Sequence, residues 1–205
     1  MIQVCLFVIA ISLDSFFVAL AYGNKVIRIP WLCSIVIASI ETCILVLSIL
    51  FSNIVQVYIP LYISNLLGGV LFLVIGCMTI GKQVIRSVLR KYRDKTVKLA
   101  YRGIMLAIDV YVDETKADFD DSKYLSIKES IVLALTLSLD SCISGIAFGL
   151  YQVSISRVIC LQFMISFLML ILGFTIGLKI KMKHHDSLSW ISGCIFLMLG
   201  LSRFM

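Results

Sequence analysis

Three carboxylate side chains stand in the middle of long apolar stretches: Asp14, Glu41 and Asp140. A charged side chain at the centre of a bilayer costs about 2.5–3.5 kcal/mol, and such residues usually mark an ion path or a proton relay. Carboxylate oxygens suit hard divalent cations such as Mn²⁺ or Mg²⁺, and they can also carry protons. The pattern therefore favours a site for cations. The alternative is that these side chains only hold helices together by hydrogen bonds.

Both aspartates belong to a motif that occurs twice, 126 positions apart. Residues 12–23 read SLDSFFVALAYG and residues 138–149 read SLDSCISGIAFG, with six identical positions. A serine follows each aspartate, and its hydroxyl can complete a coordination shell. Each copy has small residues at every fourth position, which lets helix backbones approach closely. These are Ser15, Ala19 and Gly23 in the first copy, and Ser141, Gly145 and Gly149 in the second. We expect the first and fourth helices to pack through them, bringing Asp14 and Asp140 together.

Composition indicates an all-α polytopic membrane protein. The chain has 205 residues, of which 60% are hydrophobic, and its mean hydropathy is +1.05. Only helices can cross the membrane here, and each needs about 20 apolar residues. Six apolar runs have roughly this length, at about 2–22, 31–52, 61–81, 128–150, 157–178 and 187–204. The sequence therefore predicts six transmembrane helices.

The basic residues predict the orientation of these helices. Sixteen of the eighteen Lys and Arg residues fall in three segments, 23–30, 82–128 and 179–186. Because cytoplasmic loops carry the excess of Lys and Arg, residues 23–30, 82–127 and 179–186 should be cytoplasmic and both termini should lie outside. The formal net charge of +6 is explained by these loops, which can touch anionic lipid. We therefore expect no nucleic-acid partner.

The repeat extends beyond the aspartate helices. Residues Gly69 to Gly76 in GGVLFLVIG match Gly193 to Gly200 in SGCIFLMLG, and these glycines are candidates for helix packing. Each half then holds three helices, so the second copy is upside down relative to the first. This predicts two inverted three-helix repeats, 1–81 and 128–205, joined by a cytoplasmic linker at 82–127. Substrate sites in such folds lie near the membrane midplane at the interface between the repeats.

The paired LDS helices, the three-plus-three layout and the long central loop resemble the manganese efflux pump (MntP) family. The segments YGNKVIRIP and KADFDDSKYLSIKES are most similar to its sporulation membrane protein (YtaF) branch. The resemblance implies a multi-pass protein of the bacterial plasma membrane that exports Mn²⁺ through Asp14 and Asp140. It also implies an acidic residue on the second helix, whose best match is Glu41. The branch leaves an alternative open, a sporulation-associated membrane protein with a structural or regulatory role and no transport.

The central loop contains a second candidate metal site. Residues 118–129 read DFDDSKYLSIKE, which fits the spacing of an EF-hand loop, except that Lys123 occupies the usual glycine position. The ligands for Ca²⁺ or Mn²⁺ would be Asp118, Asp120, Ser122, Ser126 and Glu129. The competing interpretation is that Ser126 and Glu129 form a capping box for the fourth helix.

We do not expect an enzyme. Intramembrane aspartyl proteases use a G-x-G-D motif, whereas Leu137, Ser138 and Leu139 precede Asp140. Both histidines, His184 and His185, lie in a short basic loop. The residues leave open which cation moves, whether protons are exchanged for it and whether the chain forms oligomers.

Overall fold

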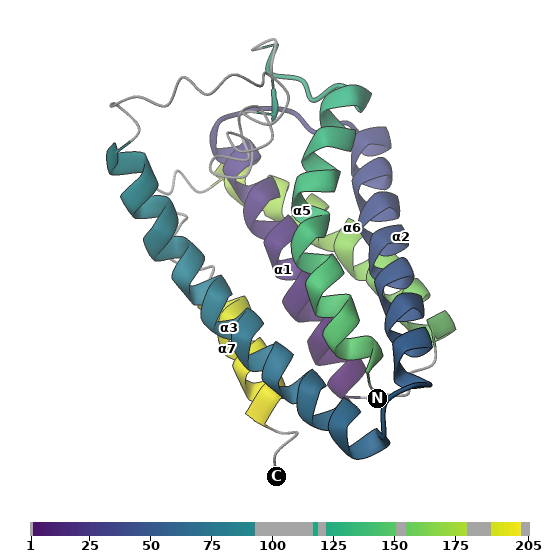
Figure 1. The fold of residues 1–205 in the computed structure, drawn as a ribbon. Coiled ribbons are helices and arrows are strands. Elements are labelled where there is room, and N and C mark those ends of the chain that lie inside the picture. The colour runs from purple at the N-terminus through teal and green to yellow at the C-terminus, as the bar shows by residue number, and fades with distance from the viewer. Residues whose placement is uncertain (1, 93–116, 119–121, 151–154, 180–189, 202–205) are drawn as a thin grey trace, which may run out of the picture.

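The computed structural model describes residues 2–92, 117–118, 122–150, 155–179 and 190–201, and this part of the chain is helical (Figure 1). The helices are α1 (Ile2–Asn24), α2 (Trp31–Gln56), α3 (Leu61–Tyr92), α5 (Ile127–Gly149), α6 (Ile155–Lys179) and α7 (Trp190–Leu201). The first five are long and apolar enough to cross a membrane. In α7, twelve residues are described. The predicted class, an all-α polytopic membrane protein, is confirmed.

Most helix ends lie within a few residues of the predicted ones, because the length of an apolar run limits the helix. The exception is α3, which continues past Gly81 to Tyr92, so the first part of the predicted linker is helical. The start of α5 is fixed by Ser126, whose side chain accepts a hydrogen bond from the backbone of Glu129. The Glu129 carboxylate accepts one from the backbone of Ser126 in return, which is a complete capping box.

The start of α1 and the end of α7 lie at one end of the helical bundle, which we call the termini end (Figure 1). The connection between α1 and α2 and the residues that lead into α5 lie at the opposite end, which we call the linker end. The side of the membrane on which both termini lie stays a prediction. That the linker end is cytoplasmic stays a prediction.

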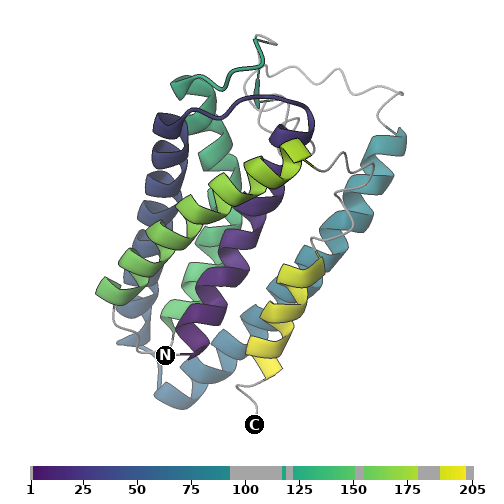
Figure 2. The same cartoon turned by 180° about the vertical axis from the view of Figure 1, so that it is seen from behind.

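Three helix pairs make the most extensive contacts: α1 with α6, α2 with α5, and α3 with α7. Figure 2 shows α6 crossing the bundle obliquely, with α3 and α7 side by side along one edge. Close backbone approach explains the first pair. A Cβ atom added to Gly173 or Gly177 of α6 would meet the carbonyl oxygen of Phe16 or Leu20 in α1. In the third pair, Gly200 lies against Leu73 and the carbonyl oxygen of Gly69.

The prediction that the small-residue stripes pack α1 against α5 is wrong. The α-carbon of Gly23 faces Phe174 and Gly177 of α6, while Gly145 and Gly149 face Ser48 and Ser52 of α2. Each stripe allows a close approach, but the stripe alone does not specify the partner helix. The surroundings of Gly193 are outside the described part of α7, so its predicted packing role stays a prediction.

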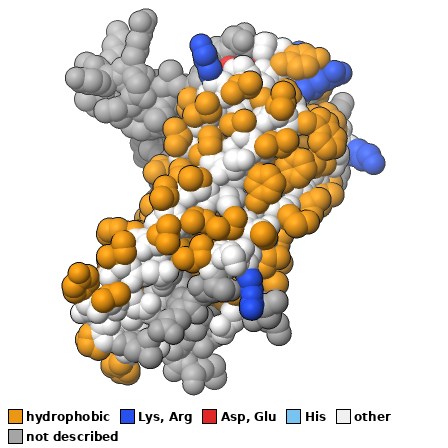
Figure 3. Space-filling model, turned by 90° about the vertical axis from the view of Figure 1, so that its right-hand side faces the viewer, with side chains coloured by type: hydrophobic (Ala, Val, Ile, Leu, Met, Phe, Trp, Pro, Cys, Tyr) orange, Lys and Arg blue, Asp and Glu red, His pale blue; other side chains and the backbone are white. Residues whose placement is uncertain are grey.

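The surface is strongly apolar. In the view of Figure 3, hydrophobic side chains cover much of the described face, and most of the Lys and Arg side chains lie in its upper part. Exposed large side chains include Trp31, Leu47, Phe51 and Met198. Contiguous apolar surface on this scale marks contact with a membrane or a partner, and here five apolar helices of sufficient length identify the membrane.

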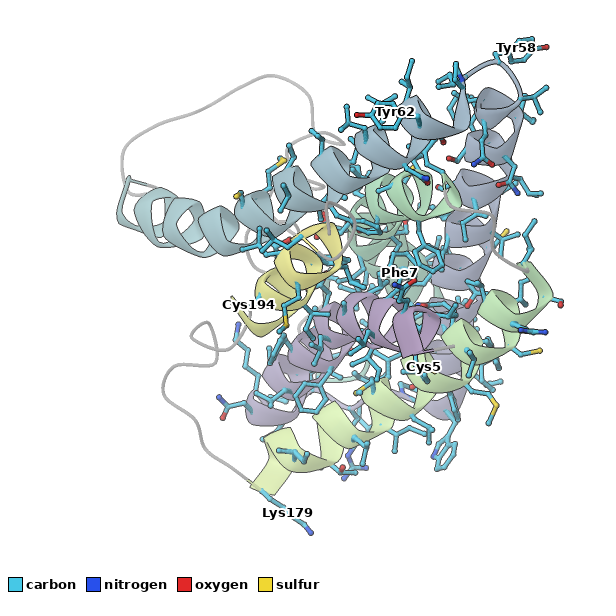
Figure 4. All side chains as sticks on the ribbon, turned by 90° about the horizontal axis from the view of Figure 1, so that it is seen from below. Cys5, Phe7, Tyr58, Tyr62, Lys179 and Cys194 are labelled. Atoms are coloured by element: carbon cyan, nitrogen blue, oxygen red, sulfur yellow. The ribbon has the colours of Figure 1, made fainter. Side chains whose placement is uncertain are left out.

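Two buried hydrophobic clusters fill the bundle. The termini-end cluster includes Phe7, Ile11, Leu45, Phe72, Phe148, Val158 and Phe196. Its aromatic rings pack closely, with the centroids of Phe7 and Phe148 3.7 Å apart. Figure 4 shows Phe7 toward the centre of the bundle, while Tyr58 and Tyr62 lie at its edge. The linker-end cluster includes Val18, Tyr22, Ile37, Leu125, Leu133 and Leu170.

Candidate functional site

A layer of buried polar residues separates the two hydrophobic clusters. In α1, residues of the termini-end cluster extend to Ile11 and those of the linker-end cluster begin at Val18. The same division holds in α2, α5 and α6. The buried polar residues between the clusters, which we call the polar layer, are Ser12, Ser15, Glu41, Thr42, Ser138, Ser141, Ser144, Gln162 and Ser166. Four helices therefore contribute polar groups at one level of the bundle.

Glu41 is the acidic member of this layer. It is only 1% exposed, and its carboxylate accepts hydrogen bonds from the hydroxyls of Ser15 (2.7 Å) and Ser166 (2.5 Å). These partners come from α1 and α6, so the carboxylate joins three helices. Every Lys and Arg whose side chain is described is exposed, at Lys25, Arg28, Lys123, Lys128, Arg157 and Lys179. Hydroxyl groups therefore satisfy Glu41, but the described residues supply no cationic side chain beside it.

The two aspartates fall within the same interval of their helices. Asp14 and Asp140 are half-buried, and each is adjacent to a buried serine, Ser15 or Ser141. Among the described residues, no group of three His, Cys, Asp or Glu side chains lies close enough to hold a metal ion. The three predicted carboxylates thus lie between the two hydrophobic clusters. The carboxylate of Glu41 contacts the hydroxyls of Ser15 and Ser166 there.

Sequence reasoning missed several members of the polar layer. Ser166 donates to Glu41, and Gln162 lies one turn earlier in α6 with its side chain completely buried. A glutamine inside an apolar run is conspicuous, as Glu41 is, so Gln162 could have been predicted as a candidate. A single serine gives no such signal, because in membrane helices most hydroxyls bond to their own backbone, as Ser48 does to the carbonyl of Ile44.

The predicted EF-hand-like loop lies at the linker end, and Asp120 is outside the described residues. Asp118 accepts a hydrogen bond from the backbone of Lys123 (3.2 Å), and Ser122 donates to the carbonyl of Tyr124. Lys123 has a φ of 60°, so the backbone makes the turn that glycine would make more easily. The predicted capping box at Ser126 and Glu129 is present. The predicted metal site in this loop stays a prediction.

This loop is attached to the connection between α1 and α2. The backbone of Arg28 donates to the carbonyl of Lys123 (2.8 Å), and Leu125 donates back to the carbonyl of Arg28 (3.0 Å). The Arg28 guanidinium also donates to the Tyr124 hydroxyl and lies 5.5 Å from the centre of its ring. The two segments that resemble the sporulation branch are therefore joined in space.

A comparison with protein families matches residues 83–204, more than half of the chain, to the family described as "Putative manganese efflux pump". The chain belongs to this manganese efflux pump family. The predicted resemblance is confirmed, and the description of the family is that of an ion transporter. The matched residues contain Asp140, whereas Asp14 and Glu41 lie outside them.

Two curated relatives extend this result. "Probable sporulation protein YtaF" of Bacillus subtilis is 26% identical over 205 residues, covering 98% of each chain. "Putative manganese efflux pump MntP" of Clostridium perfringens is 23% identical over 145 residues, covering 71% of this chain and 66% of that protein. No solved structure matches this chain. The similarity to the first relative thus includes the helices that carry Asp14 and Glu41.

Proposed function

We propose that this protein exports a divalent cation, Mn²⁺ in the first place, across the bacterial plasma membrane. The observation that carries the proposal is the carboxylate of Glu41, buried in the middle of the bundle and bonded to Ser15 and Ser166. Asp14 and Asp140, with Ser15 and Ser141, supply the remaining ligands from the same level. Membership of the manganese efflux pump family supports Mn²⁺ as the substrate.

The surroundings of Glu41 explain why a cation would bind there. A buried carboxylate is costly unless it is paired and hydrogen-bonded, because the membrane interior solvates charge poorly. Two hydroxyl donors reduce this cost without supplying a positive charge. A metal cation or a proton supplies that charge. Protons could therefore return as counter-ions when the metal leaves.

The pairing of helices supports two inverted repeats. In two inverted repeats, α1 is equivalent to α5, α2 to α6 and α3 to α7. Exchanging equivalent helices converts the contact between α1 and α6 into that between α5 and α2, and it leaves the contact between α3 and α7 unchanged. These are the three pairs with the most extensive contacts. The next pair, α2 with α6, is also unchanged by the exchange, and the two pairs after it, α1 with α7 and α5 with α3, exchange with each other. A two-fold axis between the repeats accounts for this pattern.

Glu41 lies on or near that axis. Gly23 of the first repeat is equivalent to Gly149 of the second. Gly23 faces Gly177 and Gly149 faces Ser52, so Ser52 is the equivalent of Gly177, which lies 125 positions later. The same offset relates Ser48 to Gly173, and it relates Glu41 to Ser166. Equivalent residues contact each other only close to a two-fold axis, and Glu41 and Ser166 share a hydrogen bond. One central carboxylate with an aspartate on each side makes a symmetric site that both ends of the bundle can reach in turn.

Alternating access then assigns roles to the two hydrophobic clusters. The linker-end cluster separates the polar layer from the cytoplasm, and the termini-end cluster, with Phe7 stacked on Phe148, separates it from the outside. Each cluster must open while the other stays closed, or ions would leak. The cytoplasmic basic segments would contact anionic lipid and keep this orientation.

A second candidate function comes from the relative named a probable sporulation protein, which matches 98% of this chain. Under this proposal the chain is a non-transporting membrane protein with a structural or regulatory role. The buried carboxylate favours transport, since a purely structural bundle would be served as well or better by an apolar side chain at its centre.

The experiment that separates these two functions is the relief of Mn²⁺ toxicity in cells that express Asp14→Asn or Asp140→Asn. Each change removes a hard ligand and a titratable charge while nearly preserving volume, so we expect loss of Mn²⁺ export with normal membrane levels. Asp186→Asn, in the segment between α6 and α7, is the matched control and should behave as the parent does. Full relief of toxicity by both test variants would contradict the proposed site.

A further inference from the structure

Three buried side chains of the polar layer have polar atoms without a hydrogen-bond partner in the part of the chain that the structure describes. They are the hydroxyls of Ser12 and Ser144 and both the oxygen and the nitrogen of the Gln162 amide. Gln162 and Ser12 are 0% exposed and Ser144 is 1% exposed. Leaving such groups buried and unpaired reduces stability, which calls for an explanation at each of them.

The other hydroxyls nearby show how the helices ordinarily avoid this cost. Thr42 donates to the carbonyl of Ala38, and Ser138 donates to that of Leu135. Ser15 and Ser166 donate to the carboxylate of Glu41. Ser12 and Ser144 do neither, although their own helices offer the same backbone carbonyls. Their hydroxyls, like the Gln162 amide, therefore remain available for a ligand.

All three side chains are displaced in the same direction from the level of Glu41. Ser12 lies three positions before Ser15 in α1, and Gln162 lies four positions before Ser166 in α6. Residues three or four positions apart share a helix face and differ by one turn, about 5 Å along the axis. Because both helices run from the termini end, Ser12 and Gln162 are one turn nearer to that end. They follow the face on which Ser15 and Ser166 meet at Glu41.

Ser144 is also one turn nearer to the termini end, although it follows Ser141 in the sequence, because α5 runs in the opposite direction to α1 and α6. It lies three positions after Ser141, and α5 runs toward the termini end (Figure 1). Its neighbour Gly145 lies against Leu45, which is one turn beyond Glu41 in α2. Buried residues next to all three positions, including Ile11, Leu45, Ala147 and Val158, belong to the termini-end cluster. Three helices thus bring unpaired polar atoms to the border between the polar layer and that cluster.

The fold does not require a polar residue at the position of Gln162. Under the proposed repeat, the equivalent position in the first half is Ile37, again 125 positions away. Ile37 is fully buried and belongs to the linker-end cluster. An apolar side chain is therefore accepted at this place in the architecture, and the amide of Gln162 is present in one half only.

We propose that Ser12, Ser144 and Gln162 form a second cation-binding position, which receives the divalent cation from the Glu41 level on its way to the termini end. This inference rests on the proposed export function. Its ligands would be three neutral oxygens, two hydroxyls and one amide carbonyl, which suit Mn²⁺, Mg²⁺ or Ca²⁺ together with water. Neutral ligands hold the ion less tightly than carboxylates, and a transport site must bind weakly enough to release.

The test uses purified full-length protein, with thermal unfolding measured over a Mn²⁺ titration and Mn²⁺ uptake measured in proteoliposomes. Gln162→Leu removes both unpaired atoms, so without metal its melting temperature should equal or exceed that of the parent. Its apparent affinity for Mn²⁺ should fall at least about tenfold, as for changes close to metal ligands. Gln162→Glu restores an oxygen ligand, and it should bind Mn²⁺ at least as tightly as the parent while turning over more slowly.

Gln56→Leu is the matched control, because the amide of Gln56 already donates to the carbonyl of Leu150 (2.8 Å). It should melt at a lower temperature than the parent and keep the parent's affinity for Mn²⁺. If Gln162→Leu does not fold, the double variant Ser12→Ala, Ser144→Ala makes the same test, with the same expected loss of affinity.

The second position is overturned if the parent binds and transports Mn²⁺ and Gln162→Leu, or the double variant in its place, does so with unchanged affinity. A lower melting temperature of Gln162→Leu with unchanged affinity would assign the amide a structural role instead. If the parent itself neither binds nor transports a divalent cation, the export function fails, and the second position fails with it. The parent and the variant therefore report separately on the two proposals.

Discussion

Glu41 and Ser166 illustrate what individual residues reveal. A carboxylate in an apolar run is conspicuous, so Glu41 was predictable as a candidate ligand, as were Asp14 and Asp140. The two hydroxyl partners of Glu41 differ in how well the sequence predicts them. Ser15 belongs to the repeated motif, whereas Ser166 is one serine among many and becomes significant only because α6 brings it to Glu41. The hydrogen-bond partners of a buried group depend on tertiary packing, which the sequence of one helix does not contain.

At this scale we predict the effect of Glu41→Gln. The amide keeps the volume, and its oxygen can still accept a hydrogen bond from one of Ser15 and Ser166 while its nitrogen donates to the hydroxyl oxygen of the other. The buried charge is lost. The protein should therefore fold and unfold at the same or a higher temperature than the parent, with Mn²⁺ export reduced at least about tenfold. Thermal unfolding and export are measured on the same preparation. Export at the parent's rate would exclude Glu41 as a ligand or proton carrier.

The helices were largely predictable and their partners were not. Apolar length and a capping box determine where α1, α2, α5 and α6 begin and end, so the expected ranges differ from the observed ones by a few residues. The helix pairs arise from complementary surfaces. Gly173 and Gly177 of α6 provide the surface for α1, and neither belongs to the repeated motif that drew attention to α5.

At the scale of helix pairs we compare Gly173→Ala with Gly81→Ala. A Cβ at Gly173 would collide with the carbonyl oxygen of Phe16 and meet Ala19 at 3.0 Å, whereas nothing lies within 4 Å of one at Gly81. Gly173→Ala should lower the free energy of unfolding by about 1–3 kcal/mol, as overpacking does. Gly81→Ala should raise it by about 0.5–1 kcal/mol, because alanine favours a helix more than glycine does.

Denaturant-induced unfolding of the purified protein in detergent measures both changes under one set of conditions. Equal stability of the two variants would mean that α1 and α6 do not pack through Gly173. The comparison is internal, since both substitutions add the same methyl group to a helix, and only the neighbours of that group differ.

In the whole molecule, the polar layer lies between two hydrophobic clusters inside an apolar, membrane-facing surface. Hydropathy predicted the membrane class, and the three main helix pairs are compatible with the proposed inverted repeats. The layered interior could not be predicted, because it depends on the relative height of four helices. Each helix alone shows only a few scattered polar residues, and their common level emerges when the helices are packed together.

Ion-resolved transport in proteoliposomes is the most direct measurement of the central claim, that the polar layer carries a divalent cation. The purified protein is reconstituted, and Mn²⁺, Mg²⁺, Ca²⁺ and Zn²⁺ fluxes are recorded for the parent, Asp14→Asn and Asp140→Asn. The account predicts that the parent moves Mn²⁺ and that both variants lose this flux while remaining folded. A parent that moves none of the four cations, or variants that move Mn²⁺ as fast as the parent, would contradict it.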